Sequence, residues 1–192
     1  MIILPTALHG AYVIDLEKRE DSRGFFARAW CRREFEQHHL VPDLMQANLS
    51  YNTMKGTLRG MHYQAAPYGE VKLVRCTRGR LYDVIVDLRP ESFTYGRWLG
   101  VELTADNRLM LYVPAGFAHG YETLEDNTEA LYLVSEYYTP GAERGVRYDD
   151  PAFEIVWPLP VTSVSEKDQQ WPNFRMTPSG VENREAVTYD HH

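Results

Sequence analysis

Short apolar runs with strand character, separated by turn residues, recur along most of this chain. Clear examples are RLYDVIVDLR (80–89), RWLGVEL (97–103), LMLYVP (109–114) and EALYLVSEYY (129–138). Glycine, proline and aspartate punctuate the runs at intervals of roughly ten residues, and almost no apolar pattern has the period of a helix. The sequence therefore predicts an all-β sandwich or barrel with a few short helices.

The remaining elements follow from the same signals. Further strands are expected at 11–18, 25–31, 44–50, 57–64 and 70–76. RREFEQHH (32–39) has helical composition, SVSEKDQ (163–169) predicts a turn or short helix, and AGFAHG (115–120) and TPGAERG (139–145) predict loops. With 192 residues and no linker or repeat, the chain is expected to form one domain over 1–172, followed by a loosely ordered tail over 173–192.

Charge and cysteine content exclude several classes of protein. The net charge of −7 argues against broad binding to nucleic acid or to an anionic membrane. Cys31 and Cys76 form no CxxC pair, so neither a zinc knuckle nor a disulfide framework is indicated. The first residues lack the basic flank of a signal peptide, and no apolar run approaches about 18 residues, so a soluble cytoplasmic protein is expected.

Three predicted strands carry polar residues where a core strand normally has Val or Ile. The residues are Gln46, Asn48, Arg59, His62 and Lys72. A lone histidine in a strand is most often structural, but a cationic, hydrogen-bonding cavity inside the β fold explains all five together. Arg59 and His62 are three positions apart and should face opposite ways, unless a bulge at Gly60 turns one of them.

The run EALYLVSEYY adds an aromatic pair. On a strand, Tyr132, Val134, Glu136 and Tyr138 lie on one face, as core packing or as the wall of a site. With His62 as base, Tyr132 as acid and Lys72 as a fixed positive charge, the set suits proton abstraction next to a carbonyl. The other cations suit an anionic handle such as a diphosphate.

A metal site is the alternative for the histidines. His62 and His119, with Glu70 as a carboxylate, are the available ligands. Metal-binding barrels favour a His-x-His pair, whereas this chain has His62-Tyr63-Gln64, which leaves a poor ligand set. We therefore expect no metal and no other cofactor.

Nine runs in this chain are similar to those of the dTDP-4-dehydrorhamnose 3,5-epimerases, and they occur in the family's order across roughly residues 5–172. They are DSRGFF (21–26), QANLS (46–50), LRGMHYQ (58–64), KLVRC (72–76), GRLYDVIVDLR (79–89), VPAGFAHGY (113–121), LYLVSEYY (131–138), DDPAFEIVWP (149–158) and SEKDQ (165–169). The resemblance implies a cupin-type jelly roll, a homodimer with strands crossing between subunits, and a nucleoside-diphosphate 4-keto-6-deoxyhexose as substrate.

The resemblance also implies roles for individual residues. His62 resembles the proton acceptor, Asp168 its partner carboxylate, Tyr132 the proton donor and Lys72 the cation near the keto group. Substrate- or nucleotide-binding positions are matched by Arg23, Phe26, Gln46, Asn48, Arg59, His119, Tyr138, Glu143 and Lys167. The residues alone do not choose Asp168 over Asp83 as the partner of His62.

Two positions depart from the family pattern. Arg28 stands where the family has an acidic residue that helps to hold thymine, and Ala47 stands where Asp is common. A guanidinium only donates hydrogen bonds, which suits cytosine better than the thymine ring N–H. The hypothesis is that Arg28 binds the base and favours a CDP-linked over a dTDP-linked sugar; the alternative is that Arg28 faces solvent.

Three functions remain open at this point. The first is an epimerase that inverts C3, C5 or both of the sugar through an enolate. The second is a metal-dependent dioxygenase or isomerase of the cupin type, and the third is a non-catalytic sugar-nucleotide-binding protein. The combined presence of His62, Lys72, Tyr132 and Asp168 argues against the third.

Overall fold

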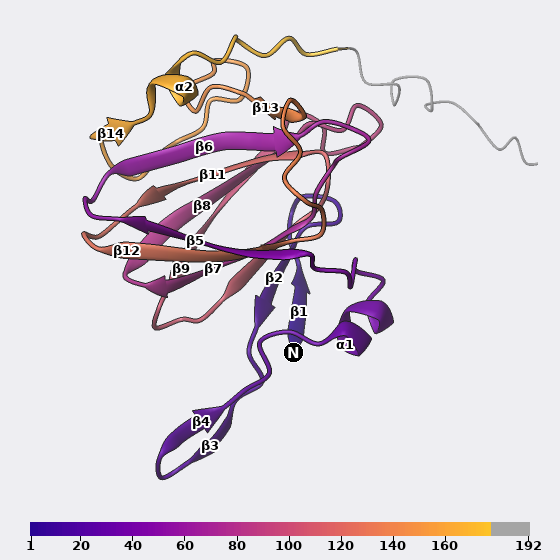
Figure 1. Ribbon diagram of the computed structural model, residues 1–192, viewed down its shortest axis with the longest axis vertical. Coiled ribbons are helices and arrows are strands. Elements are labelled where there is room, and N and C mark those ends of the chain that lie inside the picture. Colours follow the sequence, from indigo (N-terminus) through magenta and orange to yellow (C-terminus); the bar gives the residue numbers. More distant parts are fainter. Residues whose placement is uncertain (178–192) are drawn as a thin grey trace, which may run out of the picture.

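A computed structural model describes residues 1–177 as two mainly antiparallel sheets that face each other, as Figure 1 shows. The first sheet has the order β1 (Ile2–Pro5), β2 (Tyr12–Asp15), β10 (Met110–Val113), β7 (Lys72–Arg78), β12 (Thr128–Val134) and β5 (Gln46–Asn52). The second has the order β13 (Glu143–Gly145), β6 (Thr57–Gln64), β11 (Phe117–Thr123), β8 (Arg80–Asp87) and β9 (Trp98–Thr104), and β14 (Ser163–Val164) pairs with β6. The predicted all-β, cupin-type fold is confirmed.

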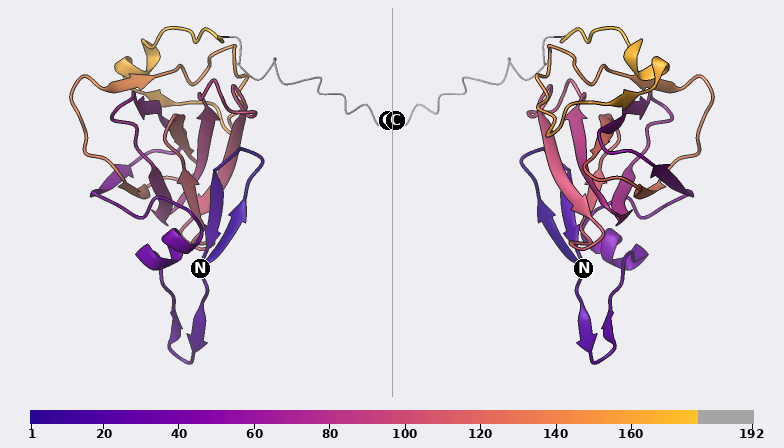
Figure 2. Two further views of the ribbon diagram at one scale, coloured as in Figure 1. Left: turned by 90° about the vertical axis from the view of Figure 1, so that its right-hand side faces the viewer. Right: turned by 90° about the vertical axis from the view of Figure 1, so that its left-hand side faces the viewer.

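Few residues lie outside these sheets in regular structure. A two-stranded hairpin, β3 (Arg19–Asp21) and β4 (Gly24–Phe26), extends away from the sheets in both views of Figure 2. Within residues 1–177 the helices are the short α1 (Arg32–Gln37) and α2 (Glu166–Gln169). Most of the tail predicted over 173–192, including the terminal histidines, lies outside the described residues. Within those residues, no helix is long and apolar enough to span a membrane.

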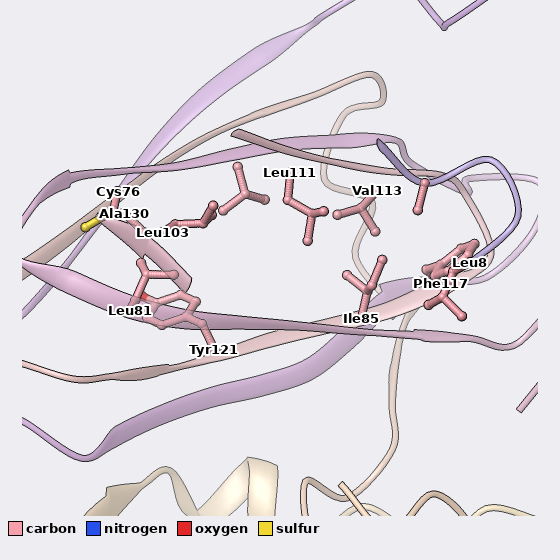
Figure 3. Close-up of a cluster of buried hydrophobic side chains, with 12 residues drawn as sticks. Leu8, Cys76, Leu81, Ile85, Leu103, Leu111, Val113, Phe117, Tyr121 and Ala130 are labelled. Carbon is pink, nitrogen blue, oxygen red and sulfur yellow. The ribbon is translucent and has the colours of Figure 1, made fainter. Parts of the chain in front are cut away.

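Three apolar clusters hold the two sheets in place. The central cluster fills the space between them, with Leu81 and Ile85 of β8 opposite Leu111 of β10 (Figure 3). A second cluster includes Phe35 of α1 together with residues of the first sheet, and a third packs Val84 and Val86 of β8 against residues that include Phe153. Strand β8 is apolar apart from Arg80, Asp83 and Asp87, because both of its faces are largely buried.

Three predicted boundaries were wrong. Residues 115–120 were expected to form a loop, but the strand β11 begins at Phe117 and carries His119 in its middle. The strand expected over 25–31 ends at Phe26, because β4 pairs only with β3 and gains no core contact. The predicted loop over 139–145 ends in the three-residue strand β13, which pairs with β6.

Strand β6 contains the irregularity that the sequence allowed for at Gly60. Opposite β11, Arg59 pairs with Tyr121 and His62 pairs with His119, so β6 has one more residue than β11 between these pairs. A Cβ atom on Gly60 would lie 2.5 Å from the Cα of Gly120. Glycine is therefore required where the two backbones approach, and the extra residue turns the strand.

Candidate active site

The interior between the sheets is apolar in one part and polar in another, and the polar part opens as a cavity. One region of about 450 Å³ is lined by residues of β5, β6, β7, β11 and β12 together with β14 and α2. A second region of about 300 Å³ adjoins it and shares His62, Lys72 and Tyr132. Three of the four predicted catalytic residues thus lie where the two regions meet.

Most of the residues predicted to bind substrate line the same two regions. The larger region contains Arg59, His119 and Lys167, and the smaller contains Gln46, Asn48, Tyr138 and Glu143. The bulge in β6 lets Arg59 and His62 both reach the cavity despite their odd spacing. Strand β12 ends at Val134, yet Tyr138 still reaches the cavity wall, where its N–H donates to Gln46 Oε1 at 3.0 Å.

His62 forms a pair with Asp168 inside the cavity. Its Nε2 lies 2.6 Å from Oδ1 of Asp168, and Oδ2 of Asp168 accepts the Gly60 N–H at 3.2 Å. Burial by itself raises the pKa of Asp168, but the hydrogen bond and charge of His62, together with the N–H of Gly60, outweigh it and leave this pKa below its usual value. The carboxylate stays ionised and can orient the imidazole.

A helix cap places Asp168 at this position. Ser165 precedes α2, and its side chain accepts a hydrogen bond from the Asp168 N–H at 3.1 Å. This is the first half of a capping box, in which a serine satisfies the N–H of the third helical residue. The run SEKD therefore both begins the helix and turns the carboxylate towards His62.

A second histidine–carboxylate pair lies deeper in the cavity. His119 Nε2 lies 2.7 Å from Oδ1 of Asp83, and the Asp83 side chain is fully buried. The other oxygen of Asp83 has no hydrogen-bond partner among the described residues. Asp83 was considered at the sequence level as a partner for His62, and the structure places it on His119 instead.

Lys72 and Tyr132 complete the centre of the cavity. Lys72 Nζ lies 2.7 Å from Glu70 Oε1, and both side chains are largely buried. Burial raises the pKa of Tyr132, nearby Tyr121 and Glu70 raise it further, and Arg59 opposes them. Tyr132 therefore keeps its proton at neutral pH and is available as a donor. At the rim, Lys167 of α2 is ion-paired with Glu143 of β13.

Three predicted binding residues lie outside the cavity of their own chain. Arg23 and Phe26 are on the β3–β4 hairpin, where the Arg23 side chain is 87% exposed and bound to Asp21 at 2.6 Å. Phe26 is 68% exposed. Arg28 follows the hairpin, and its guanidinium lies 3.5 Å from a carboxylate oxygen of Glu34 in α1.

The structure also shows residues that the sequence did not single out. Trp171 follows α2, and its ring centroid lies 6.5 Å from that of His62. It packs on Gly145, where a Cβ atom would lie 2.3 Å from the indole. Asn52 and Tyr121 lie beside Arg59. In the sequence, the only hint of this contact is an aromatic residue on one short segment and a glycine on another. No local pattern connects Trp171 with Gly145.

The described residues hold no group of three or more His, Cys, Asp or Glu side chains arranged to bind a metal ion. His62 and His119 are opposite each other across β6 and β11, but each is bonded to its own carboxylate.

Comparison with known proteins agrees with this arrangement. The family model described as dTDP-4-dehydrorhamnose 3,5-epimerase matches residues 5–176. The chain belongs to this family of nucleotide-sugar epimerases. The family's enzyme from Sinorhizobium fredii is 44% identical over 155 residues, which are 80% of each chain.

Solved structures of the family have the same fold. The dTDP-4-dehydrorhamnose 3,5-epimerase of Bacillus anthracis, with TDP and PPi bound, has a TM-score of 0.86 and 37% identity over 90% of this chain and 99% of that one. A dTDP-6-deoxy-D-glucose-3,5-epimerase from Legionella pneumophila, in complex with dTDP-4-keto-L-rhamnose, has a TM-score of 0.80 and 32% identity over 91% and 99%. Both matches span nearly the whole of each chain.

Proposed function

We propose that this protein inverts C3, C5 or both of a dTDP-linked 4-keto-6-deoxyhexose by removing and returning a proton next to the ketone. The observation that carries the proposal is the meeting of the His62–Asp168 pair, Tyr132 and Lys72 in one cavity. Family membership favours this epimerase over the metal-dependent and non-catalytic alternatives. The relatives' bound TDP and dTDP-4-keto-L-rhamnose supply the substrate class.

The proton transfers follow from the positions of the donors and acceptors. Nε2 of His62 faces Asp168, so Nδ1 is the nitrogen that takes the proton from the carbon beside the ketone. The electron pair left on carbon forms an enolate, and the ammonium group of Lys72 stabilises its oxygen. Tyr132 then gives its proton to the carbon from the opposite face, which inverts the centre.

The catalytic groups must return to their starting state after each inversion. His62 leaves the step protonated and Tyr132 leaves it as a phenolate. The His62 side chain is 31% exposed, so it can release its proton to water, and Tyr132 regains one from solvent through the open cavity. The net reaction consumes no proton and needs no redox cofactor.

The cations around the cavity suit the diphosphate of the substrate. Arg59 and Lys167 line the larger region together with His119. Guanidinium and ammonium groups bind phosphate oxygens through charge-assisted hydrogen bonds. The smaller region, with Gln46 and Asn48 on its wall, offers neutral donors and acceptors to the rest of the substrate.

A homodimer is part of the proposal because Arg23, Phe26 and Arg28 do not reach the cavity of their own chain. The hairpin that carries the first two extends beyond the body of the subunit, as Figure 2 shows. It has the shape of an arm that inserts into a second copy. Mixing inactive His62→Ala subunits with inactive Arg23→Ala subunits should then restore activity, since one site in the mixed dimer has both residues. A mixture that stays inactive despite exchanging subunits would contradict this arrangement.

The defining experiment is incubation with dTDP- and CDP-linked 4-keto-6-deoxyglucose in D₂O, followed by NMR at C3 and C5. Deuterium at one or both carbons, with the inverted configuration, is the expected result. Absence of exchange with both sugars would overturn the proposal.

Activity should also survive prolonged chelation, and loss of activity that added metal restores would favour a metal-dependent reaction instead.

Arg28 raises a narrower question about the nucleotide. The sequence hypothesis is that Arg28 binds the base and favours CDP, whereas in its own chain Arg28 lies near Glu34 and is 60% exposed. Inhibition by dTDP and by CDP should be compared for wild type and Arg28→Glu. An unsatisfied buried donor costs roughly 1–3 kcal/mol, or about 5- to 150-fold in affinity. If dTDP binds wild type as tightly as CDP, Arg28 does not contact the base.

The cytoplasmic location and the lack of nucleic-acid binding also stay predictions.

A further inference from the structure

Four polar side chains form a continuous hydrogen-bonded chain in the wall of the cavity, which Ser50, Arg59 and Tyr121 line. Ser50 Oγ lies 2.7 Å from the Tyr121 hydroxyl, which accepts a hydrogen bond from Asn52 Nδ2 at 3.1 Å. Asn52 Oδ1 in turn accepts the Nε–H of Arg59 at 2.7 Å. The chain begins on β5, crosses to β11, returns to β5 and ends on β6, so it joins the two sheets at the edge of the cavity.

The donor and acceptor between Asn52 and Arg59 follow from the surroundings of Asn52. Asn52 is 3% exposed, and its Nδ2 points to oxygen acceptors only: the hydroxyl of Tyr121 and the carbonyls of Ser50 and Thr128. The amide oxygen is therefore the atom that faces Arg59. The Tyr121 oxygen accepts from Asn52, and between Ser50 and Tyr121 either hydroxyl can be the donor, so Tyr121 supplies one of the two available protons. Burial raises the pKa of Tyr121, which keeps that proton in place.

The network acts on Arg59 at one nitrogen. Guanidinium is planar, so a hydrogen bond at Nε together with the Cδ bond limits how the plane can rotate. The two terminal nitrogens have no hydrogen-bond partner among the described residues, and the side chain is exposed where it lines the cavity. These nitrogens form the fork that binds phosphate oxygens in a bidentate manner.

We propose that Asn52 and Tyr121 are positioning residues that hold the Arg59 guanidinium with its terminal nitrogens towards the diphosphate of the substrate. This inference rests on the proposed function, since it needs an anionic ligand in the cavity. Asn52 contacts Arg59 directly, and Tyr121 lines the cavity with its hydroxyl bonded to Ser50 and Asn52. Their loss acts through Arg59, in the affinity for the nucleotide and in KM more than in kcat.

The expected effects differ between the two residues. Tyr121→Phe removes one hydroxyl and leaves Asn52 with its two carbonyl acceptors, so dTDP binding weakens by roughly 2- to 10-fold. Asn52→Ala removes the acceptor of the Arg59 Nε–H, so binding weakens by roughly 10- to 150-fold, the range for a hydrogen bond to a charged group. Tyr121→Phe keeps the aromatic ring and its packing.

The chain offers a matched control for the loss of a buried hydroxyl. Tyr112 is 4% exposed, as is Tyr121, and its hydroxyl accepts the Val41 N–H at 3.1 Å in the cluster beneath α1. Tyr112→Phe therefore removes a comparable hydrogen bond without touching the cavity. Thermal unfolding of both variants separates loss of stability from loss of binding.

The test is a double-mutant cycle measured by calorimetric titration with dTDP and with pyrophosphate. In wild-type protein, Tyr121→Phe should weaken both ligands and Tyr112→Phe should weaken neither. In an Arg59→Ala background, Tyr121→Phe should have no further effect, because the group it positions is gone. Equal weakening by Tyr121→Phe with and without Arg59 would overturn the inference and assign Tyr121 a role of its own.

The outcomes also separate this inference from the proposed function. If wild type binds dTDP and Arg59→Ala weakens it, but Tyr121→Phe and Asn52→Ala do not, the positioning role alone is wrong. If wild type binds neither dTDP, CDP nor pyrophosphate and exchanges no deuterium, the proposed function fails, and the inference fails with it. A rise in KM for Tyr121→Phe with the folded fraction unchanged supports both.

Discussion

The two histidine–carboxylate pairs of the cavity are alike in distance and different in surroundings. Nε2 to Oδ1 is 2.6 Å for His62–Asp168 and 2.7 Å for His119–Asp83. The His62 side chain is 31% exposed and its carboxylate accepts a further N–H, whereas the His119 side chain is 9% exposed and the second oxygen of Asp83 has no partner among the described residues.

This difference separates a group that can turn over protons from one that is fixed. A base must reach the substrate and then release its proton, and access to water serves both needs. A deeply buried pair with few exchange routes suits a constant hydrogen bond to the ligand instead. The geometry of the pairs alone does not distinguish them; their exposure supports the proposed assignment of His62 as the base.

The largest expected effect tests which histidine is the base. His62→Ala should lower deuterium incorporation into the sugar by roughly 10²–10⁴-fold while dTDP binding survives, because a general base typically supplies that factor. His119→Ala should raise KM more than it lowers kcat. The measurement is exchange in D₂O at saturating substrate. Exchange at the wild-type rate in His62→Ala would remove His62 from the mechanism.

Tyr132→Phe tests whether acid and base act on opposite faces. His62 can still remove a proton and return one to its own face, so exchange should fall less than inversion. NMR reports deuterium content and configuration in the same sample. A ratio of exchange to inversion equal to that of wild type would count against Tyr132 as the donor. Tyr112→Phe, which removes a buried hydroxyl away from the cavity and keeps Tyr132, is the control.

Substitution of each carboxylate should change the same kinetic constant as substitution of its histidine, but by a smaller factor. Asp168→Asn keeps the shape but replaces an acceptor with an amide, which disturbs the orientation and tautomer of His62. We expect kcat to fall roughly 10- to 150-fold, the range for a hydrogen bond to a charged group. Asp83→Asn should act through His119, mainly on KM. A similar loss of kcat in both variants would erase the distinction between the pairs.

The smallest effect is on stability as a function of pH. The pKa of Asp168 in the folded protein lies below its ordinary value of 3.8, so its ionised form stabilises the fold. This contribution to stability is complete above pH 3.8, the ordinary pKa of the group. It is lost as the pH falls through the lower pKa that Asp168 has in the folded protein. The difference in unfolding free energy between wild type and Asp168→Asn should therefore shrink only at acidic pH, in urea titrations. A difference that shrinks near neutral pH would contradict the lowered pKa.

Local pattern in the sequence predicted most of the strands. The runs over 57–64, 80–89, 97–103 and 109–114 became β6, β8, β9 and β10, and 32–39 became α1. Strand periodicity depends on neighbouring residues, so it can be seen in one segment at a time. The same reasoning failed at 115–120, where glycine and alanine predicted a loop. Gly120 is there because β6 and β11 approach closely, which is a relation between two strands.

The membership of the cavity was also visible in part, because polar residues in strands must find partners. Which partner each one finds was decided by the tertiary structure. His62 and Asp168 are 106 positions apart, and His119 and Asp83 are 36 apart, so the residues alone could not choose between the two carboxylates. The bulge in β6 and the capped helix α2 make that choice. Strand pairing and chain reversal set the distances between atoms, and those distances depend on contacts that no single segment contains.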